Sequence, residues 1–157
     1  MFLSHACFKN VVKSTPLVSI DLIVENEIGH ILLGRRTNRP ARGYWFVPGG
    51  RVQKNETLDT AFQRLTQDEI GCKVSRDCTD FLGVYEHFYN ENFSDEDFST
   101  HYVVLGYHIK VVTGELSLPL EQHDSYLWIN INDLLSHKEV HDNTKAYFFN
   151  EKPRVTL

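Results

Sequence analysis

The sequence lacks the features that mark several large classes of protein. It has only three cysteines, Cys7, Cys72 and Cys78, and their odd number and wide spacing fit neither a disulfide framework nor a zinc site. Its apolar runs all fall short of the ~18 residues of a membrane span, and the N-terminal segment MFLSHACF is too short and too interrupted for a secretory signal. We therefore expect a cytoplasmic protein from a reducing compartment, with no membrane partner.

An excess of positive charge is also missing, because the formal net charge at pH 7 is -5. Proteins that bind nucleic-acid backbones are normally basic, so no nucleic-acid partner is expected, although a local basic cluster for one nucleotide is compatible with this charge. The chain also lacks internal repeats, low-complexity tracts and linker-like segments. Its 157 residues therefore predict one domain, 1–157, which is long enough for a substantial core.

The hydrophobic periodicity predicts strands before, between and after one well-marked helix. The expected strands, of which the first two form a hairpin, are 17–25, 30–36, 44–47, 81–89, 100–112 and 126–129. Shorter helices are expected at 5–13, after a cap at Asn132, and over 144–152 after a cap at Asn143. This pattern predicts the α/β class, with a mixed sheet and helices packed on its faces.

The segment 50–71 joins a glycine corner to the well-marked helix. Two glycines after Pro48 permit backbone angles that side chains forbid and a close approach to a ligand. At about 3.6 residues per turn, one helix face carries Leu58, Phe62, Leu65 and Glu69. Because three of these are apolar, the face should pack inward and bury the Glu69 carboxylate, which must then be paired, protonated or bound to a cation. Mg²⁺ takes such oxygen ligands.

A polar cluster at 121–124 offers further groups for chemistry. Gln122 can give a cation a neutral amide oxygen, and the imidazole of His123 suits a general base near neutral pH. Asp21 or Asp124 can orient that imidazole, as in other pairs of a base and its orienting group. The simpler alternative is a solvated polar surface, since the whole segment 118–125 is predicted to be a loop.

A basic cluster in this acidic chain surrounds the glycine corner. Five arginines fall close together: Arg35, Arg36, Arg39, Arg42 and Arg51. Guanidinium groups bind phosphate oxygens in a bidentate manner, so we expect Arg36 and Arg51 to contact a diphosphate. Ordinary surface solvation is the alternative for each of the five, above all for Arg39 and Arg42.

The spacing of residues from Gly50 to Gly71 resembles the Nudix box, a loop-helix-loop that holds a divalent cation against a diphosphate. The matching positions are Gly50, Glu56, Arg64, Asp68, Glu69 and Gly71. Three positions depart from the box: Leu65 replaces a glutamate, Thr66 replaces an aliphatic residue, and Asp68 replaces the first residue of the usual Glu-Glu pair. The resemblance runs over nearly the whole chain and implies the Nudix α/β/α sandwich.

Within that family, the segments 45–52 (WFVPGGRV) and 64–66 (RLT) resemble the GDP-mannose mannosyl hydrolases. This resemblance implies Mg²⁺-dependent hydrolysis of GDP-mannose, with Mn²⁺ and GDP-glucose as further candidates for metal and substrate. Water would attack the sugar C1 and invert the anomeric centre, releasing GDP and free sugar. The resemblance also implies a homodimer and a role in recycling or regulating GDP-sugars for surface polysaccharide.

The same resemblance assigns roles to individual residues. The implied metal ligands are the backbone oxygen of Gly49 and the side chains of Glu69 and Gln122. The implied general base is His123, oriented by Asp21, and the residues implied to contact the nucleoside are Phe2, Leu3 and Phe8. Beside these, we expect Arg36 and Arg51 to stabilise the leaving diphosphate by their charge, Tyr102 to donate a further hydrogen bond, and His87 to reach phosphate or sugar.

Two alternative functions fit the same sequence. An ordinary Nudix pyrophosphohydrolase would cut the P–O–P bond of a nucleotide sugar or dNTP, but it would use a carboxylate base, and the box glutamate is missing at Leu65. A non-catalytic nucleotide-sugar sensor would keep only the fold, which the joint presence of Glu69, Gln122 and His123 disfavours. The missing carboxylate directs attention to His123 as an external base.

Overall fold

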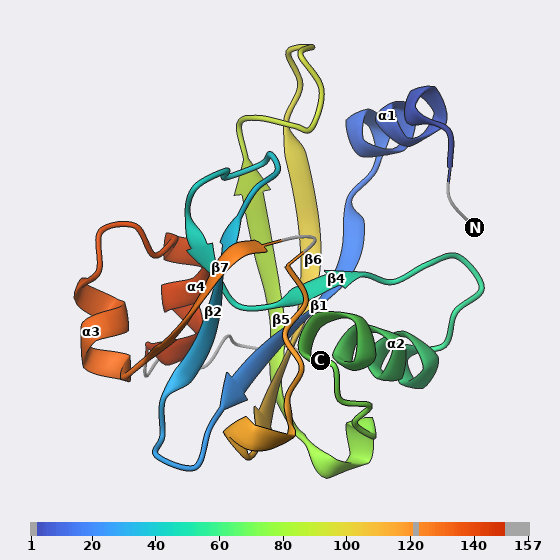
Figure 1. The fold of residues 1–157 in the computed structure, drawn as a ribbon. Helices are drawn as coiled ribbons and strands as arrows, with labels where there is room; N and C mark the ends of the chain where they lie inside the picture. Colours follow the sequence, from blue (N-terminus) through green and yellow to red (C-terminus); the bar gives the residue numbers. More distant parts are fainter. Residues whose placement is uncertain (1–2, 121–122, 150–157) are drawn as a thin grey trace.

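The computed structural model describes residues 3–120 and 123–149, and its centre is a mixed seven-stranded sheet (Figure 1). The strands are β1 (Leu17–Glu25), β2 (Ile31–Arg36), β3 (Trp45–Phe46), β4 (Gly49–Arg51), β5 (Asp80–Tyr89), β6 (Thr100–Lys110) and β7 (His123–Ile129). The α-helices are α1 (His5–Ser14), α2 (Leu58–Ile70), α3 (Ile131–Ser136) and α4 (Asp142–Lys145). Three short 3₁₀ turns are η1 (Arg76–Cys78), η2 (Thr113–Glu115) and η3 (Ala146–Phe148). The predicted α/β class is confirmed.

Strand β1 is the central strand of the sheet, whose order is β3-β2-β1-β6-β5. It pairs in parallel with β6 along its whole length and antiparallel with β4, while β7 pairs antiparallel with β2. The predicted hairpin of β1 and β2 is therefore wrong for most of its length, because these two strands share only the register pair Glu25–Ile31. Two other strands, β4 and β6, lie beside β1 instead.

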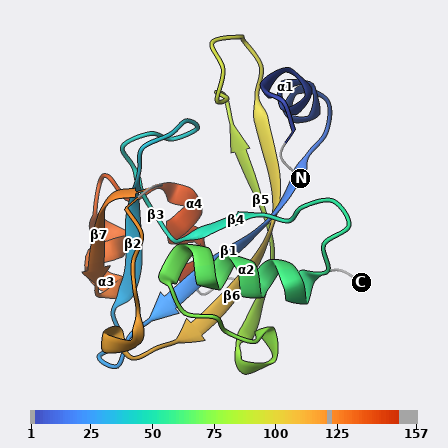
Figure 2. The same ribbon diagram turned by 45° about the vertical axis from the view of Figure 1, so that its right-hand side comes forward.

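Helices cover both faces of the sheet, as Figure 2 shows. Under α2, the fully buried residues include Ile20, Leu22, Phe62 and Ile70. On the opposite face, α3 and η3 pack over a second cluster that includes Ile23, Leu33, Val47, Leu134 and Val140. Full burial of one large apolar side chain stabilises a fold by about 1.5–3 kcal/mol. These two clusters hold β1 and β4 in place beneath the cavity described below.

Helix α2 begins and ends with the expected local signals. The Thr57 hydroxyl accepts a hydrogen bond from the Thr60 amide at 3.1 Å, and Gly71 ends the helix with φ of 67°, a left-handed angle that favours glycine. Leu65 and Glu69 are 3% and 2% exposed, so the inward-facing stripe is confirmed at these positions. Leu58 departs from it, because it lies in the first helical turn and is 36% exposed.

The last third of the described chain corrects three boundaries. Asn130, two residues before the expected cap Asn132, accepts the Asp133 amide at 2.9 Å and starts α3. His141 in place of Asn143 starts α4. In the described part of the predicted helix 144–152, α4 ends at Lys145 and η3 follows through Phe148, while 150–152 lie outside the described residues. Within the described ranges, no helix has the length and apolarity needed to cross a membrane.

Candidate active site

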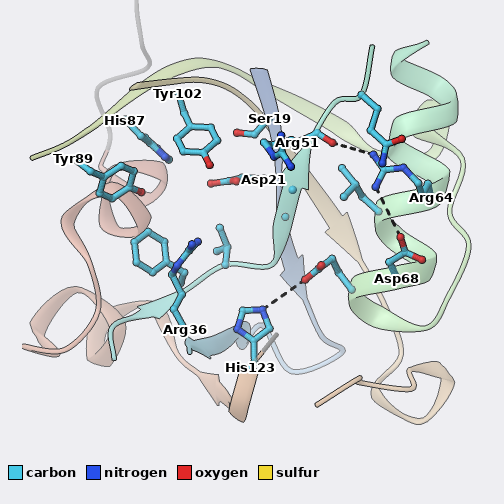
Figure 3. Close-up of a pocket in the computed structure, with 17 residues that line it drawn as sticks. Ser19, Asp21, Arg36, Arg51, Arg64, Asp68, His87, Tyr89, Tyr102 and His123 are labelled. Atoms are coloured by element: carbon cyan, nitrogen blue, oxygen red, sulfur yellow. Dashed lines mark hydrogen bonds and ion pairs between the residues drawn. The ribbon is translucent and has the colours of Figure 1, made fainter. Parts of the chain in front are cut away.

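A cavity of about 520 Å³ opens where β4 crosses between α2 and the ends of β1, β2 and β5 (Figure 3). It collects most of the residues that the sequence singled out. The predicted site residues on its wall are Asp21, Arg36, Gly49, Arg51, Glu69, His87, Tyr102 and His123. Gln122 and Phe2 lie outside the residues that the structure describes. Leu3 and Phe8 are described but do not line this cavity.

Glu69 and His123 form the buried end of the cavity. Their exposed fractions are 2% and 6%, and the His123 Nε2 atom lies 3.6 Å from the Glu69 Oε2 atom. His123 is the first residue of β7 and pairs with Arg36 of β2, so it belongs to a strand and the loop predicted through 125 is shorter. Gly34 lies beneath the imidazole, because a Cβ atom there would be 2.5 Å from Nδ1. The ring thus rests directly on the backbone of β2.

Gly49 presents its carbonyl oxygen away from β1. Leu22 donates to the Pro48 carbonyl and Val52 donates to the Val18 carbonyl, so the intervening pair Asp21–Gly49 occupies a non-hydrogen-bonded position. Hard oxygen atoms from this carbonyl and from the buried Glu69 carboxylate fit a Mg²⁺ ion, which usually takes few ligands from protein. In the described part of the chain, no cluster of three or more His, Cys, Asp or Glu side chains could hold a metal.

The loop before α2 is braced by Arg64. Its guanidinium donates to both oxygens of Glu56, at 2.7 and 2.9 Å, and to the Arg51 carbonyl at 2.9 Å. This bidentate contact lowers the pKa of Glu56 and confirms that Glu56 and Arg64 span the box. Asp68 is 3.8 Å from Arg64 and its side chain is 55% exposed, so it lines the cavity on the solvent-exposed side, whereas Glu69 lies at the buried end.

Leu65 occupies the position of the missing box glutamate and is a core residue. It is 3% exposed and packs against the glycine corner, where a Cβ atom on Gly50 would lie 2.6 Å from the Leu65 Cδ2 atom. A carboxylate in this space would have to displace apolar neighbours and would be desolvated. The box therefore contributes one buried carboxylate to the described cavity, that of Glu69, while the more exposed carboxylate of Asp68 also lines it.

Only two of the five clustered arginines line the cavity, and they are the two predicted to bind a diphosphate, Arg36 and Arg51. The Arg36 guanidinium carbon lies 5.3 Å from the centre of the Phe46 ring, and its buried Nε has no hydrogen-bond partner among the described residues. The Arg51 guanidinium carbon lies 4.1 Å from the centre of the Phe8 ring. The other three are bound elsewhere: Arg35 to the Gly43 carbonyl, Arg39 to Asp95 and Arg42 to the Thr37 carbonyl.

Asp21 is held by a residue that the sequence reasoning missed. Tyr147 donates a hydrogen bond to its Oδ2 atom at 2.6 Å, and burial raises the pKa of Asp21 to about 6. Asp21 was expected to orient His123; both line the cavity, no hydrogen bond joins them among the described residues, and the orienting role stays a prediction. The side chain of Asp124, the other candidate, lies outside the description.

The remaining wall is aromatic and polar. His87 is 5% exposed, and burial lowers its pKa to about 4. Burial also raises the pKa of Tyr102. The cavity residues to which no role was given include Ser19, Phe46 and Gln53. Ser19 could have been found from the sequence, because it alternates with Asp21 on one face of β1.

The nucleoside prediction rests on residues beside the cavity. Phe8 of α1 contacts Arg51 on one side and Phe93 on the other, with ring centroids 4.8 Å apart. Leu3 precedes α1 and is 48% exposed. The structure therefore places Phe8 next to a cavity arginine, and a role for Phe8 and Leu3 in binding a base stays a prediction.

Comparison with known proteins identifies the family. The family model for the NUDIX domain matches residues 15–150. The chain belongs to the Nudix family. Members act on nucleoside diphosphate derivatives and generally use a divalent metal such as Mg²⁺, and this chain is a Nudix hydrolase. The cavity that holds Glu69, the glycine corner and two arginines is therefore the candidate active site of this hydrolase.

Individual relatives add detail. The chain is 42% identical over 108 residues to the "Low-salt glycan biosynthesis protein Agl8" of Haloferax volcanii, covering 69% of this chain and 67% of that protein. It is 34% identical over 103 residues to an ADP-ribose pyrophosphatase of Methanocaldococcus jannaschii, covering 64% of this chain and 54% of that one. The MutT protein of Methanosarcina mazei Go1 superposes with a TM-score of 0.68 at 22% identity, over 86% of this chain and 92% of that one, which shows the fold alone.

The buried carboxyl of Asp21 leads to a prediction about stability. Its folded pKa of about 6 lies above the ordinary aspartate value of 3.8, so its protonated form is favoured by folding. The stabilisation is complete below pH ~4 and is lost as the pH rises through about 6, a change of about 3 kcal/mol. Asp21→Asn, which cannot ionise, should therefore gain about that much free energy of unfolding relative to the parent between pH 4 and pH 7.

The measurement is urea unfolding of both proteins at the two pH values, with a chelator present. The parent alone is a poor probe, because the pKa of His87 is lowered to about 4. Its contribution to the free energy of unfolding is therefore lost as the pH falls, which is opposite to the change for Asp21. The difference between variant and parent removes the His87 contribution. An equal difference at both pH values would show that Asp21 has an ordinary pKa.

Proposed function

We propose that this Nudix hydrolase cleaves GDP-mannose, or a related GDP-hexose such as GDP-glucose, by water attack at the sugar C1. The observation that carries the proposal is that the cavity lacks the usual box glutamate and contains a buried histidine that can act as the general base. Leu65 fills the box position that normally holds a glutamate, and His123, which comes from β7 outside the box, is buried with Nε2 3.6 Å from the Glu69 Oε2 atom. A base supplied from outside the box can activate the water that attacks the sugar C1.

Each residue of the cavity then has a defined task. His123 takes the proton of the attacking water, while Arg36 and Arg51 stabilise the charge that develops on the GDP leaving group. Glu69 and the Gly49 carbonyl, together with the predicted ligand Gln122, would hold Mg²⁺ or Mn²⁺. When bound, such a cation neutralises diphosphate oxygens. Attack opposite to the leaving group inverts the anomeric centre.

The relatives support two different bonds as the point of cleavage. A relative named for glycan biosynthesis, 42% identical to this chain, favours a sugar nucleotide as substrate. A relative named as an ADP-ribose pyrophosphatase favours the second candidate, cleavage of the P–O–P bond. The buried Leu65 weighs against that second candidate, because the carboxylate base it would use at this position is absent.

Hydrolysis in ¹⁸O-labelled water separates these candidates. Incubation of the protein with GDP-mannose and Mg²⁺ is expected to release GDP and to place the label in the sugar. Proton NMR of the anomeric signal should show β-mannose first, since the substrate is an α-linked sugar and the mechanism inverts. Label in a phosphate would establish P–O–P cleavage instead.

Binding of GDP-mannose with no turnover would favour a non-catalytic sensor.

A homodimer is also part of this proposal, and sedimentation of the purified chain tests it. A single monomeric species at micromolar concentration would exclude the dimer without affecting the assignment of the reaction.

A further inference from the structure

Tyr147 lies behind the cavity wall, in the last turn that the structure describes. It belongs to η3 and packs on the sheet face that carries Asp21, in the cluster formed with Ile23, Val47 and Leu134. Its hydroxyl donates to the Asp21 Oδ2 atom at 2.6 Å and lies 3.5 Å from the Nε2 atom of His87. Both of those residues line the cavity, whereas Tyr147 does not. One hydroxyl thus contacts two groups of the wall, from β1 and from β5.

The fold makes a dedicated space for this side chain. Gly106 of β6 is the register partner of Asp21, and a Cβ atom at Gly106 would lie 3.1 Å from the Tyr147 Cε1 atom and 3.2 Å from the Tyr85 Cε2 atom. The rings of Tyr85 and Tyr147 meet edge to face, with centroids 4.5 Å apart. Glycine at 106 therefore lets the tyrosine ring pass close to the sheet and bring its hydroxyl to the carboxylate.

The chemistry of Asp21 indicates which part of a substrate it faces. With Oδ2 occupied by Tyr147, a single carboxylate oxygen is left for the cavity. A carboxylate accepts hydrogen bonds from hydroxyl groups and is repelled by phosphate oxygens, for which Arg36 and Arg51 are suited. Asp21 therefore suits the uncharged, hydroxyl-bearing part of the substrate, and its orientation decides which hydroxyl it accepts from.

We propose that Tyr147 is a positioning residue, which holds Asp21 and His87 in the orientation needed to bind the hydroxyl-bearing sugar of the substrate. The sugar as ligand rests on the proposed function. Hydrogen bonds to charged groups contribute enough that the loss of one changes an equilibrium by about ten-fold or more. Tyr147→Phe is therefore expected to raise KM for GDP-mannose about ten-fold, with a smaller change in kcat.

A comparison of two ligands separates positioning from general damage. The inhibition constant of GDP, which lacks the sugar, should stay within about two-fold of the parent value, whereas a disrupted cavity would weaken GDP as well. The matched control is Tyr85→Phe, which removes a hydroxyl from the ring that touches Tyr147 but has no contact with Asp21 in the described residues. This control should leave both constants unchanged.

A double-mutant cycle tests whether Tyr147 acts through Asp21. In an Asp21→Asn background, Tyr147→Phe should change kcat/KM by less than about three-fold, because the carboxylate that it positions is gone. A full ten-fold effect in that background, or equal losses for GDP-mannose and GDP, would overturn the proposal. If the parent does not cleave GDP-mannose, the proposed function fails first. A crystal structure of Tyr147→Phe then decides the positioning role, since an unmoved Asp21 carboxylate would overturn it.

Discussion

His123→Gln is expected to lower kcat for GDP-mannose hydrolysis by about 10²–10⁴-fold, the usual contribution of a general base. Glutamine has a comparable size and can form hydrogen bonds, but it cannot take a proton from water. His123 is 6% exposed and rests on the Gly34 backbone, so the ring has one fixed position from which to act. The rate is measured from the anomeric proton signal at neutral pH and saturating Mg²⁺ and substrate.

Two measurements keep this prediction specific to the base. His30→Gln, a matched change outside the cavity, should retain the parent rate. The thermal unfolding temperature of each variant shows whether the fold survives the change, because a buried imidazole is replaced. If folded His123→Gln protein has a kcat within about ten-fold of the parent value, His123 is not the general base. A carboxylate would then be the next candidate.

The parts of the site that were predictable from sequence are those whose signals are local. The stripe that buries Glu69 needs only helical periodicity, and the helix end needs only Gly71 with its positive φ. The Glu56–Arg64 brace also lies within one box, eight residues apart. For such features, the spacing of the residues in the sequence is enough to predict which of them are in contact.

The parts that were missed depend on contacts between distant segments. Tyr147 and Asp21 are 126 positions apart, and nothing in the short sequence around Tyr147 differs from that of an ordinary packing aromatic. The prediction that β1 pairs mainly with β2 was wrong for the same reason. The turn at 26–29 predicts a hairpin, but β1 is flanked by β4 and β6, whose pairing is decided by burial of the whole sheet.

The clustered arginines are close together in sequence but have different surroundings in the fold. Composition alone did not distinguish the five as phosphate ligands, and Arg36 and Arg51 were the two predicted to contact the diphosphate. In the fold, Arg39 is bound by the acidic loop through Asp95 and Arg42 by a carbonyl of its own loop. Of the five, Arg36 on β2 and Arg51 on β4 therefore bring positive charge to the cavity, which Arg64 of α2 also lines while paired with Glu56.

Glu69→Gln is expected to remove most of the Mg²⁺-dependent activity, with a fall in kcat/KM of at least about 10²-fold. The carboxylate is 2% exposed and faces the cavity, so its charge is available to a cation and poorly screened by water. An amide keeps the shape and one oxygen but loses the charge. In the parent, Mg²⁺ at about 100 times its Kd should add about 2.7 kcal/mol to the free energy of unfolding, and this increment should vanish in the variant.

Asp68→Asn is the matched control, because the adjacent carboxylate is 55% exposed in its side chain and lies 3.8 Å from Arg64. It should keep the Mg²⁺-dependent stabilisation and lose only a few-fold in rate, since exposed ion pairs contribute little. Without metal, Glu69→Gln should be as stable as the parent or more so, because it removes a buried charge. Equal losses in the Asp68 and Glu69 variants would mean that both carboxylates hold the cation, since Asp68 also lines the cavity.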